Sequence, residues 1–209
     1  MEIFQPPFSL WLSDRPLVLA SGSPARKVLL EAAGIPLTIA IAAIDERGIE
    51  ASIPSAGPEE IACHLARAKA KSVCAAHPDH LVAGADQTLA LDGHLFHKPT
   101  TRQQAIGHLE ALSGRVHDLH TALSVWRDNV EVFHCSARAR LKVRHLSSGF
   151  IAEYLATIGK AAFASVGTYQ VEGVGIQLFD WIEGEHSTIL GLPLLALLGF
   201  LRDEGSLSS

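Results

Sequence analysis

The chain has 209 residues, a formal net charge of −5 at pH 7 and three cysteines. This length suits one domain with a substantial core, and the acidic balance argues against a protein that wraps a nucleic acid polymer, since such domains carry a basic excess. The cysteines lack paired metal-ligand spacing, and their odd number suits reduced thiols. We therefore expect a cytoplasmic protein with no nucleic acid polymer as partner.

Residues 1–16 carry several apolar side chains but do not read as a targeting segment. Glu2, Pro6 and Pro7 spoil both a signal peptide and a membrane span, so we expect no membrane partner. We expect an N-terminal extension over residues 1–16 that packs on the surface or stays loose. Residues 17–209 contain no internal repeat or interdomain linker, which predicts a single domain.

Residues 17–30 run from apolar residues into small polar ones and back, which predicts a strand, a tight loop and a helix. Ser23 suits the N-cap of that helix and Pro24 its first position. Arg26 and Lys27 then fall in the first turn, where the helix dipole disfavours cations unless an anion binds there. We interpret the loop as a phosphate site. The alternative is an ordinary capped helix with two solvated basic residues, because the loop lacks the full P-loop glycine pattern.

Hydrophobic periodicity and turn residues place the remaining elements in chain order. Strands are expected over residues 37–41, 81–85, 116–126, 130–144 and 176–179. Helices are expected over 58–76, from Thr100 or Thr101 to Gly114, from Ser147 or Ser148 to 158, and after Pro193. Turn-forming residues fill 48–58, and hairpin turns are expected at 92–93 and 128–129.

Two groups of side chains invite a functional interpretation that we do not favour. Arg138, Arg140, Lys142 and Arg144 form a basic stripe on one strand, which the net charge makes a solvated sheet face rather than a nucleic acid site. The histidine pairs at 94 and 97 and at 117 and 120 have a spacing that puts the two rings on opposite faces of a strand, so no zinc site is expected.

Asp86 interrupts an apolar run that would otherwise be buried. A lone carboxylate near the core needs a cation or strong hydrogen-bond donors. A metal or a proton-transfer task would explain it, and a structural cap or a salt bridge is the alternative.

Seven motifs occur in an order that resembles the Maf family of nucleotide pyrophosphatases, over about residues 17–202. They are Ser21-Gly22-Ser23-Pro24-x-Arg26, Asp45-Glu46, Leu65-Ala66-Arg67-Ala68-Lys69-Ala70, Gly84-Ala85-Asp86-Gln87, Lys98-Pro99, Leu112-Ser113-Gly114 and Gly191-Leu192-Pro193. The resemblance implies an α/β fold like that of Maf proteins and inosine triphosphatase, with a mixed elongated central sheet flanked by helices and two lobes around a cleft. It also implies hydrolysis of a nucleoside triphosphate to the monophosphate and pyrophosphate, with Mg²⁺ or Mn²⁺ as cofactor.

The same resemblance implies roles for individual residues. Asp86 would be the proton acceptor, and Glu46 and Asp86 would bind the metal, with Asp45 competing with Glu46 for that role. The substrate would be bound by Ser21, Ser23, Arg26, Lys69, Lys98, Gln87 and Glu172. Cationic groups and a metal are what phosphoanhydride hydrolysis needs for charge neutralisation. Besides the nucleotide, a second copy of the chain is a candidate partner, and the sequence leaves the oligomeric state open.

Three positions bear on which nucleotide base the protein prefers. Ala25, Gln87 and Glu172 stand where thymidine and uridine triphosphate pyrophosphatases of the family have Arg, Thr and Gln. The stretch 167–179 instead resembles the subgroup that hydrolyses 7-methyl-GTP, and a carboxylate at 172 suits the donors and the positive charge of that base. Ala25 departs from the subgroup, which has an aromatic residue there, so the base preference stays open. The alternative function is a nucleotide-binding regulator of cell division without turnover.

Overall fold

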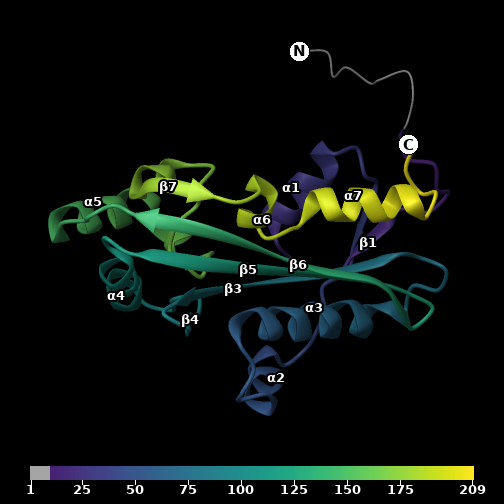
Figure 1. The fold of residues 1–209 in the computed structure, drawn as a ribbon, viewed down its shortest axis with the longest axis horizontal. Coiled ribbons are helices and arrows are strands. Elements are labelled where there is room, and N and C mark those ends of the chain that lie inside the picture. Colours follow the sequence, from purple (N-terminus) through teal and green to yellow (C-terminus); the bar gives the residue numbers. More distant parts are fainter. Residues whose placement is uncertain (1–9) are drawn as a thin grey trace.

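A computed structural model of the chain describes residues 10–209, which form one long mixed sheet flanked by helices (Figure 1). The sheet order is β2-β1-β3-β5-β6-β7, with β4 paired to β3. The strands are β1 (Leu17–Leu19), β2 (Leu37–Ile39), β3 (Val82–Leu91), β4 (His94–Phe96), β5 (Val116–Arg127), β6 (Val130–Val143) and β7 (Phe179–Glu183). β1 runs parallel to β2 and β3, and the other pairings are antiparallel. The expected mixed α/β fold is confirmed.

The helices lie on both faces of this sheet (Figure 1). They are α1 (Pro24–Ala32), α2 (Glu46–Ser52), α3 (Pro58–Cys74), α4 (Arg102–Leu112), α5 (Ser148–Ile158), α6 (His186–Ile189) and α7 (Leu194–Asp203), with 3₁₀ turns at Gly159–Phe163 and Val174–Leu178. α3 covers one face, and α1 and α7 cover part of the other. None of the helices in residues 10–209 is long and apolar enough to cross a membrane.

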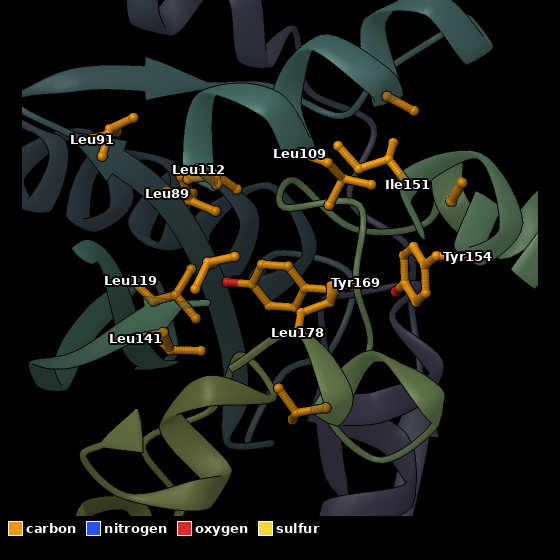
Figure 2. Close-up of a cluster of buried hydrophobic side chains, with 14 of the residues drawn as sticks. Leu89, Leu91, Leu109, Leu112, Leu119, Leu141, Ile151, Tyr154, Tyr169 and Leu178 are labelled. Carbon is orange, nitrogen blue, oxygen red and sulfur yellow. The ribbon is translucent and has the colours of Figure 1, made fainter. Parts of the chain in front are cut away.

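Two apolar clusters at opposite ends of the long strands make the two lobes. One packs α4, α5 and the segment before β7 against the far ends of β3, β5 and β6, with Tyr154, Tyr169 and Leu178 among its members (Figure 2). The other packs α1 and α7 against β1 and the near end of β3. Because the same strands run through both clusters, the lobes share one rigid sheet.

Local signals explain most of the boundaries. Ser23 caps α1 with Pro24 as its first residue, as expected. The turn between β5 and β6 is confirmed, and both of its central residues, Asp128 and Asn129, have positive φ.

Four expected boundaries are wrong, each for a physical reason. The strand at 37–41 ends at Ile39, because its pairing partner β1 ends at Leu19. The turn-rich stretch contains α2, because Asp45 accepts a hydrogen bond from the backbone N–H of Gly48 at 3.0 Å and caps that helix. The strand at 81–85 continues through Asp86 to Leu91, since β5 pairs with it along its whole length. The strand expected at 176–179 instead lies at 179–183, where β6 offers a partner edge.

The segment 10–16 packs against the C-terminal end of the chain. The N–H of Leu12 donates to the Ser206 carbonyl at 2.9 Å, and Trp11 forms a bridge with Leu207 and lies in the α1–α7 cluster. The rest of the expected extension, residues 1–9, lies outside the described residues.

Three of the four residues of the basic stripe contact other groups of the protein, while Arg138 is exposed. Arg140 lies 3.9 Å from Asp118 and 3.5 Å from Glu183 in two ion pairs. Lys142 donates to the Gly114 carbonyl, and the Arg144 guanidinium lies 4.1 Å from the ring centroid of Phe150. These contacts give the stripe a part in holding the sheet to its surroundings.

Candidate functional site

A cleft of about 500 Å³ lies between the two lobes. β1 contacts β3 at Val82 and Ala83, and β4 contacts it at Leu89–Leu91. The stretch of β3 between these two contacts lines the cleft, so Asp86 and Gln87 both reach it although they project from opposite faces of the strand. The interruption of pairing along this edge is what opens the cleft.

One end of the cleft is charged and the other is mainly apolar. The charged end contains Arg26, Glu46, Lys69 and Asp86, whose charges interact with one another, and Lys98 is a further cation in the cleft lining. The apolar end is lined by Phe96, Leu119, Val166, Tyr169, Val171 and Ile189, which belong to or pack against the apolar cluster of α4 and α5, and Glu172 follows Val171 in the chain. Such a division suits a ligand that has an anionic part and a flat, less polar part.

The charged end depends on a close approach of α3 to β3. A side chain at Gly84 would place its Cβ 2.4 Å from the Ala66 carbonyl oxygen and 2.5 Å from the Ala70 nitrogen. Only glycine therefore allows the two backbones to lie this close. The contact brings Lys69 of α3 over the strand, where its Nζ lies 2.5 Å from Asp86 Oδ1.

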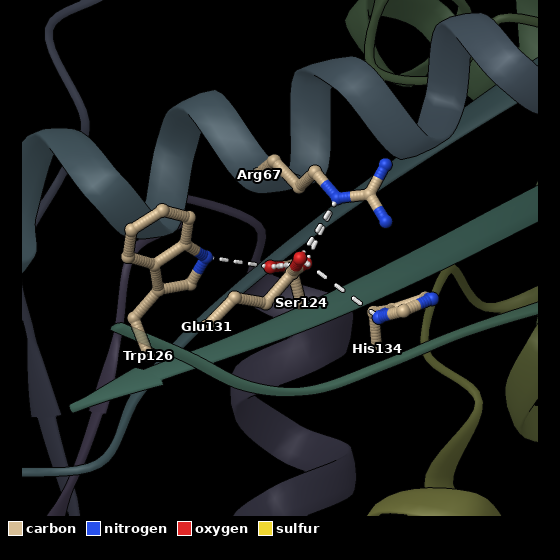
Figure 3. Close-up of polar contacts among 5 residues, drawn as sticks. All are labelled: Arg67, Ser124, Trp126, Glu131 and His134. Carbon is tan, nitrogen blue, oxygen red and sulfur yellow. Dashed lines mark hydrogen bonds and ion pairs between the residues drawn. The ribbon is translucent and has the colours of Figure 1, made fainter. Parts of the chain in front are cut away.

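A polar cluster on the same face holds α3 against the sheet (Figure 3). Arg67 Nε donates to both carboxylate oxygens of Glu131, at 2.9 and 3.1 Å. Ser124 donates to the same carboxylate at 2.8 Å and accepts from Trp126 Nε1. Because Arg67 is two residues from Lys69, this cluster also fixes the helix that carries Lys69.

Lys69 joins two carboxylates that are far apart in the sequence. Its Nζ lies 2.8 Å from Glu46 Oε1 as well as 2.5 Å from Asp86 Oδ1. Burial raises the pKa of Asp86, against the opposing effect of the positive charges of Lys69 and Arg26. A carboxylate with a raised pKa is closer to the range in which it can accept a proton efficiently near neutral pH.

Arg26 is not solvated, in contrast to the alternative interpretation of the first loop as an ordinary capped helix with two solvated basic residues. It is 8% exposed, and its Nε donates to the Gly191 carbonyl at 2.7 Å while Nη1 donates to Ser21 Oγ at 3.0 Å. Burial lowers the pKa of the guanidinium, whereas Asp86 and Glu46 raise it. Its neighbour Lys27 is solvated and pairs with Glu31 at 3.7 Å. Arg26 thus joins the first loop to the segment after α6.

The two serines of the first loop have different surroundings. Ser23 lines the cleft and accepts from the Arg26 N–H, which makes it the helix cap. Ser21 is buried, and its hydroxyl oxygen accepts from both Arg26 and the Ser23 N–H.

Gln87 uses its side-chain nitrogen within the protein. Nε2 lies 2.8 Å from Thr121 Oγ1, 2.9 Å from the Thr188 carbonyl and 3.1 Å from the Ile189 carbonyl. The amide therefore ties β3 to β5 and α6. Sequence reasoning missed Thr121 and Thr188, which carry no motif signal.

Lys98 and Glu172 are exposed at the cleft walls. The unexpected helix α2 adds Arg47 and Glu50 to the lining, 3.2 Å apart, with His97 Nε2 at 3.9 Å from Glu50. Recognising Asp45 as a helix cap would have predicted α2 and located these side chains.

Glu46 and Asp86 are the two carboxylates that would hold a divalent cation, with the substrate supplying further ligands. The described part of the chain has no group of three or more His, Cys, Asp or Glu side chains arranged to hold a metal. Glu46 and Asp86 nevertheless converge on one cationic group, Lys69 Nζ. Magnesium is usually held by one or two carboxylates together with substrate phosphates and water, which is the set of ligands that this pair would need.

Comparisons with known proteins identify the family of this chain. The model of the Maf-like protein family matches residues 16–204. A nucleoside triphosphate pyrophosphatase of Rhodopseudomonas palustris is 52% identical over 196 residues, covering 94% of this chain and 97% of the relative. A protein of the same name from Bradyrhizobium diazoefficiens is 50% identical, covering 93% and 96%. A 7-methyl-GTP pyrophosphatase of Rhizobium johnstonii is 49% identical over 193 residues, covering 91% and 97%. The chain belongs to the Maf family.

Proposed function

We propose that this protein hydrolyses a nucleoside triphosphate to the monophosphate and pyrophosphate, with 7-methyl-GTP or a related modified purine nucleotide as its preferred substrate. The observation that carries the proposal is the convergence of Lys69, Glu46 and Asp86 at the charged end of a cleft whose other end is apolar. The names of the relatives support the same reaction, and they include both a general and a 7-methyl-GTP pyrophosphatase at about 50% identity.

The charged end offers each group that the reaction needs. The triphosphate lies against Lys69, Lys98 and the Ser23 end of α1, whose backbone N–H groups favour an anion. Asp86 accepts the proton of a water molecule as that water adds across the α–β phosphoanhydride bond, which breaks to release pyrophosphate. Glu46 and Asp86 would hold a divalent metal, which would supply further charge neutralisation on the phosphates. Arg26 orders the loop and adds a buried positive charge.

The apolar end is the place for the base. Phe96, Leu119 and Val166 offer flat or branched apolar surface there. Glu172 brings a negative charge that complements a cationic 7-methylguanine and can accept its N1–H and amine hydrogens. Gln87 supports α6 behind this end rather than presenting its nitrogen to the base.

The proposal also includes a cytoplasmic location and assembly as a homodimer. The thiols of Cys63, Cys74 and Cys135 are free, which suits the reducing cytoplasm. A homodimer is the expected assembly, and light scattering at several protein concentrations tests it.

A substrate panel tests the function. Pyrophosphate release is measured with 7-methyl-GTP, GTP, dTTP and UTP, after EDTA treatment and after addition of Mg²⁺ or Mn²⁺. We expect turnover only with metal, fastest with 7-methyl-GTP. Tight nucleotide binding without turnover under all these conditions would instead support a regulator of cell division.

The base assignment has its own variant. Glu172→Gln should lower kcat/KM for 7-methyl-GTP about 5-fold, the equivalent of about 1 kcal/mol for an exposed charged acceptor. Glu153→Gln, an exposed carboxylate on α5, is the matched control and should change nothing. An unaltered substrate ranking in Glu172→Gln would remove that residue from base recognition.

A further inference from the structure

One wall of the cleft is a segment without regular secondary structure over most of its length, residues 164–172. Every residue of this 164–172 wall except Thr168 lines the cleft. Thr168 is buried and has a φ of +62°. A threonine in this conformation is uncommon, and such a conformation persists only where surrounding contacts enforce it.

The 164–172 wall is folded around the ring of Tyr169. Ser165 Oγ accepts from the Tyr169 N–H at 3.1 Å and donates to the Tyr169 carbonyl at 2.7 Å. A Cβ at Gly167 would lie 2.2 Å from the Tyr169 ring, so only glycine fits at that position. The conformation of the wall therefore depends on where this ring is held.

The ring is held inside the apolar cluster of the α4–α5 lobe. Tyr169 lies among Leu119, Leu141 and Leu178 in Figure 2, and it meets Phe179 edge-on with ring centroids 4.9 Å apart. Its hydroxyl oxygen lies 2.6 Å from Nε2 of His117, a residue of β5 that is 1% exposed.

If its only role were to fill the core, this polar pair would be less favourable than an apolar pair. Burial lowers the pKa of His117 to about 4, so the ring is neutral at pH 7 and the contact is an uncharged hydrogen bond. His117 Nδ1 is buried and has no hydrogen-bond partner within the described residues. An apolar pair of similar shape would avoid that desolvation. What the hydrogen bond adds is a fixed position for the Tyr169 ring.

β5 anchors both walls of the apolar end from one face. His117 and Thr121 are four residues apart on the strand, so their side chains project from the same face. Thr121 donates to the Thr188 carbonyl of α6 at 2.9 Å, while His117 holds the 164–172 wall through Tyr169. The width between these walls is thus set from a single rigid strand.

We propose that His117, acting through the hydroxyl of Tyr169, is a positioning residue that sets which base the cleft accepts. This inference rests on the proposed function, because it takes the apolar end as the base site. His117 is 1% exposed and is not among the residues that line the cleft, so we expect it to affect binding of the base and to leave the chemical step alone.

The test compares Tyr169→Phe, His117→Leu and the double variant with the wild-type protein. Tyr169→Phe keeps the ring and removes only the hydroxyl, so a change in this variant reports the loss of the hydrogen bond that positions the ring. We measure kcat and KM for 7-methyl-GTP and UTP, and the dissociation constants of both nucleotides by calorimetry in EDTA. Leu112→Val, a fully buried change in the same apolar cluster outside the cleft lining, is the control for general destabilisation.

We define the selectivity ratio as kcat/KM for 7-methyl-GTP divided by kcat/KM for UTP. In Tyr169→Phe we expect this ratio to move toward one by about 5- to 10-fold, the equivalent of one buried hydrogen bond. The change should lie in KM and in the dissociation constants, with kcat within about 2-fold of wild type. The selectivity ratio of the double variant should change by no more than that of either single variant, because each substitution removes the same hydrogen bond. Leu112→Val should lower Tm without changing the ratio.

An unchanged ratio in folded Tyr169→Phe, or an equal change for both nucleotides, would overturn the proposal and leave a purely structural role. The dissociation constants give this answer even without turnover. A wild-type protein that prefers UTP would refute the base assignment made above, and it would do so whatever Tyr169→Phe does to the ratio.

Discussion

Arg26→Ala is the substitution for which the structure gives the largest expected loss of stability at the site. The guanidinium is buried, and it donates to the Gly191 carbonyl at 2.7 Å and to Ser21 Oγ at 3.0 Å. Its removal leaves two buried acceptors without these donors. Hydrogen bonds from charged groups contribute about 1.5–3 kcal/mol each, partly offset here by the desolvation of the buried charge. We therefore expect a net loss of about 3 kcal/mol.

For a chain of this size about 1 kcal/mol corresponds to a shift of roughly 2–4 °C in Tm, so Tm should fall by about 6–12 °C. The measurement is thermal unfolding followed by circular dichroism, checked by urea unfolding. Pyrophosphate release should also slow, with a higher KM for the triphosphate, because the first loop and the segment after α6 lose their link.

Two further variants separate charge from geometry. Lys27→Ala removes the neighbouring exposed cation, whose ion pair with Glu31 spans 3.7 Å, and should change stability by less than about 0.5 kcal/mol. Arg26→Lys keeps the positive charge but loses the planar guanidinium that donates from both Nε and Nη1. It should therefore recover only part of the stability lost in Arg26→Ala. Arg26→Ala that is as stable as Lys27→Ala would refute the reasoning.

Three other outcomes follow from the packing. Gly84→Ala should destabilise the protein by at least about 2 kcal/mol in urea unfolding, since its Cβ would lie 2.4 Å from the Ala66 carbonyl; a Tm near wild type would show that α3 can move away freely. Glu131→Gln weakens the half-buried pair with Arg67 and should cost about 1 kcal/mol, with the loss greater at low than at high salt; a salt-independent result would contradict an ionic contribution. His117 has a pKa lowered to about 4, so between pH 4 and 6.5 the unfolded chain binds more protons than the folded one and stability should rise with pH, by on the order of 3 kcal/mol in total. The pH dependence should be shallower in His117→Leu, and an identical slope would contradict the assignment.

The elements with strong local signals could be predicted from the sequence. The Ser23-Pro24 start of α1 and the Asp128-Asn129 turn depend on capping and on positive φ, which act within a few residues. The course of β3 through Asp86 could not be predicted that way, because pairing with β5 outweighs one charged residue in the run. α2 was missed because seven residues with no buried member give no apolar periodicity.

The candidate site shows the same division. Motif order identified Lys69, Glu46 and Asp86, and these three converge in space. What the motifs could not indicate is which atoms are already used within the protein. The nitrogen of Gln87 bonds to α6, and Ser21 accepts from Arg26, contacts that join residues far apart in the sequence. Tyr169 and His117 meet across 52 residues, and no local pattern marks such a pair.

Pyrophosphate release by folded Asp86→Asn tests the assigned catalytic site most directly. The amide keeps the shape of the side chain, but it cannot accept the proton of water or carry the charge that a metal needs. We expect wild type to release pyrophosphate from a nucleoside triphosphate in the presence of Mg²⁺ or Mn²⁺, and Asp86→Asn to be slower by about a hundredfold to ten-thousandfold with an intact circular dichroism spectrum. Turnover close to wild type in folded Asp86→Asn would contradict the assignment of the catalytic site to the charged end of this cleft.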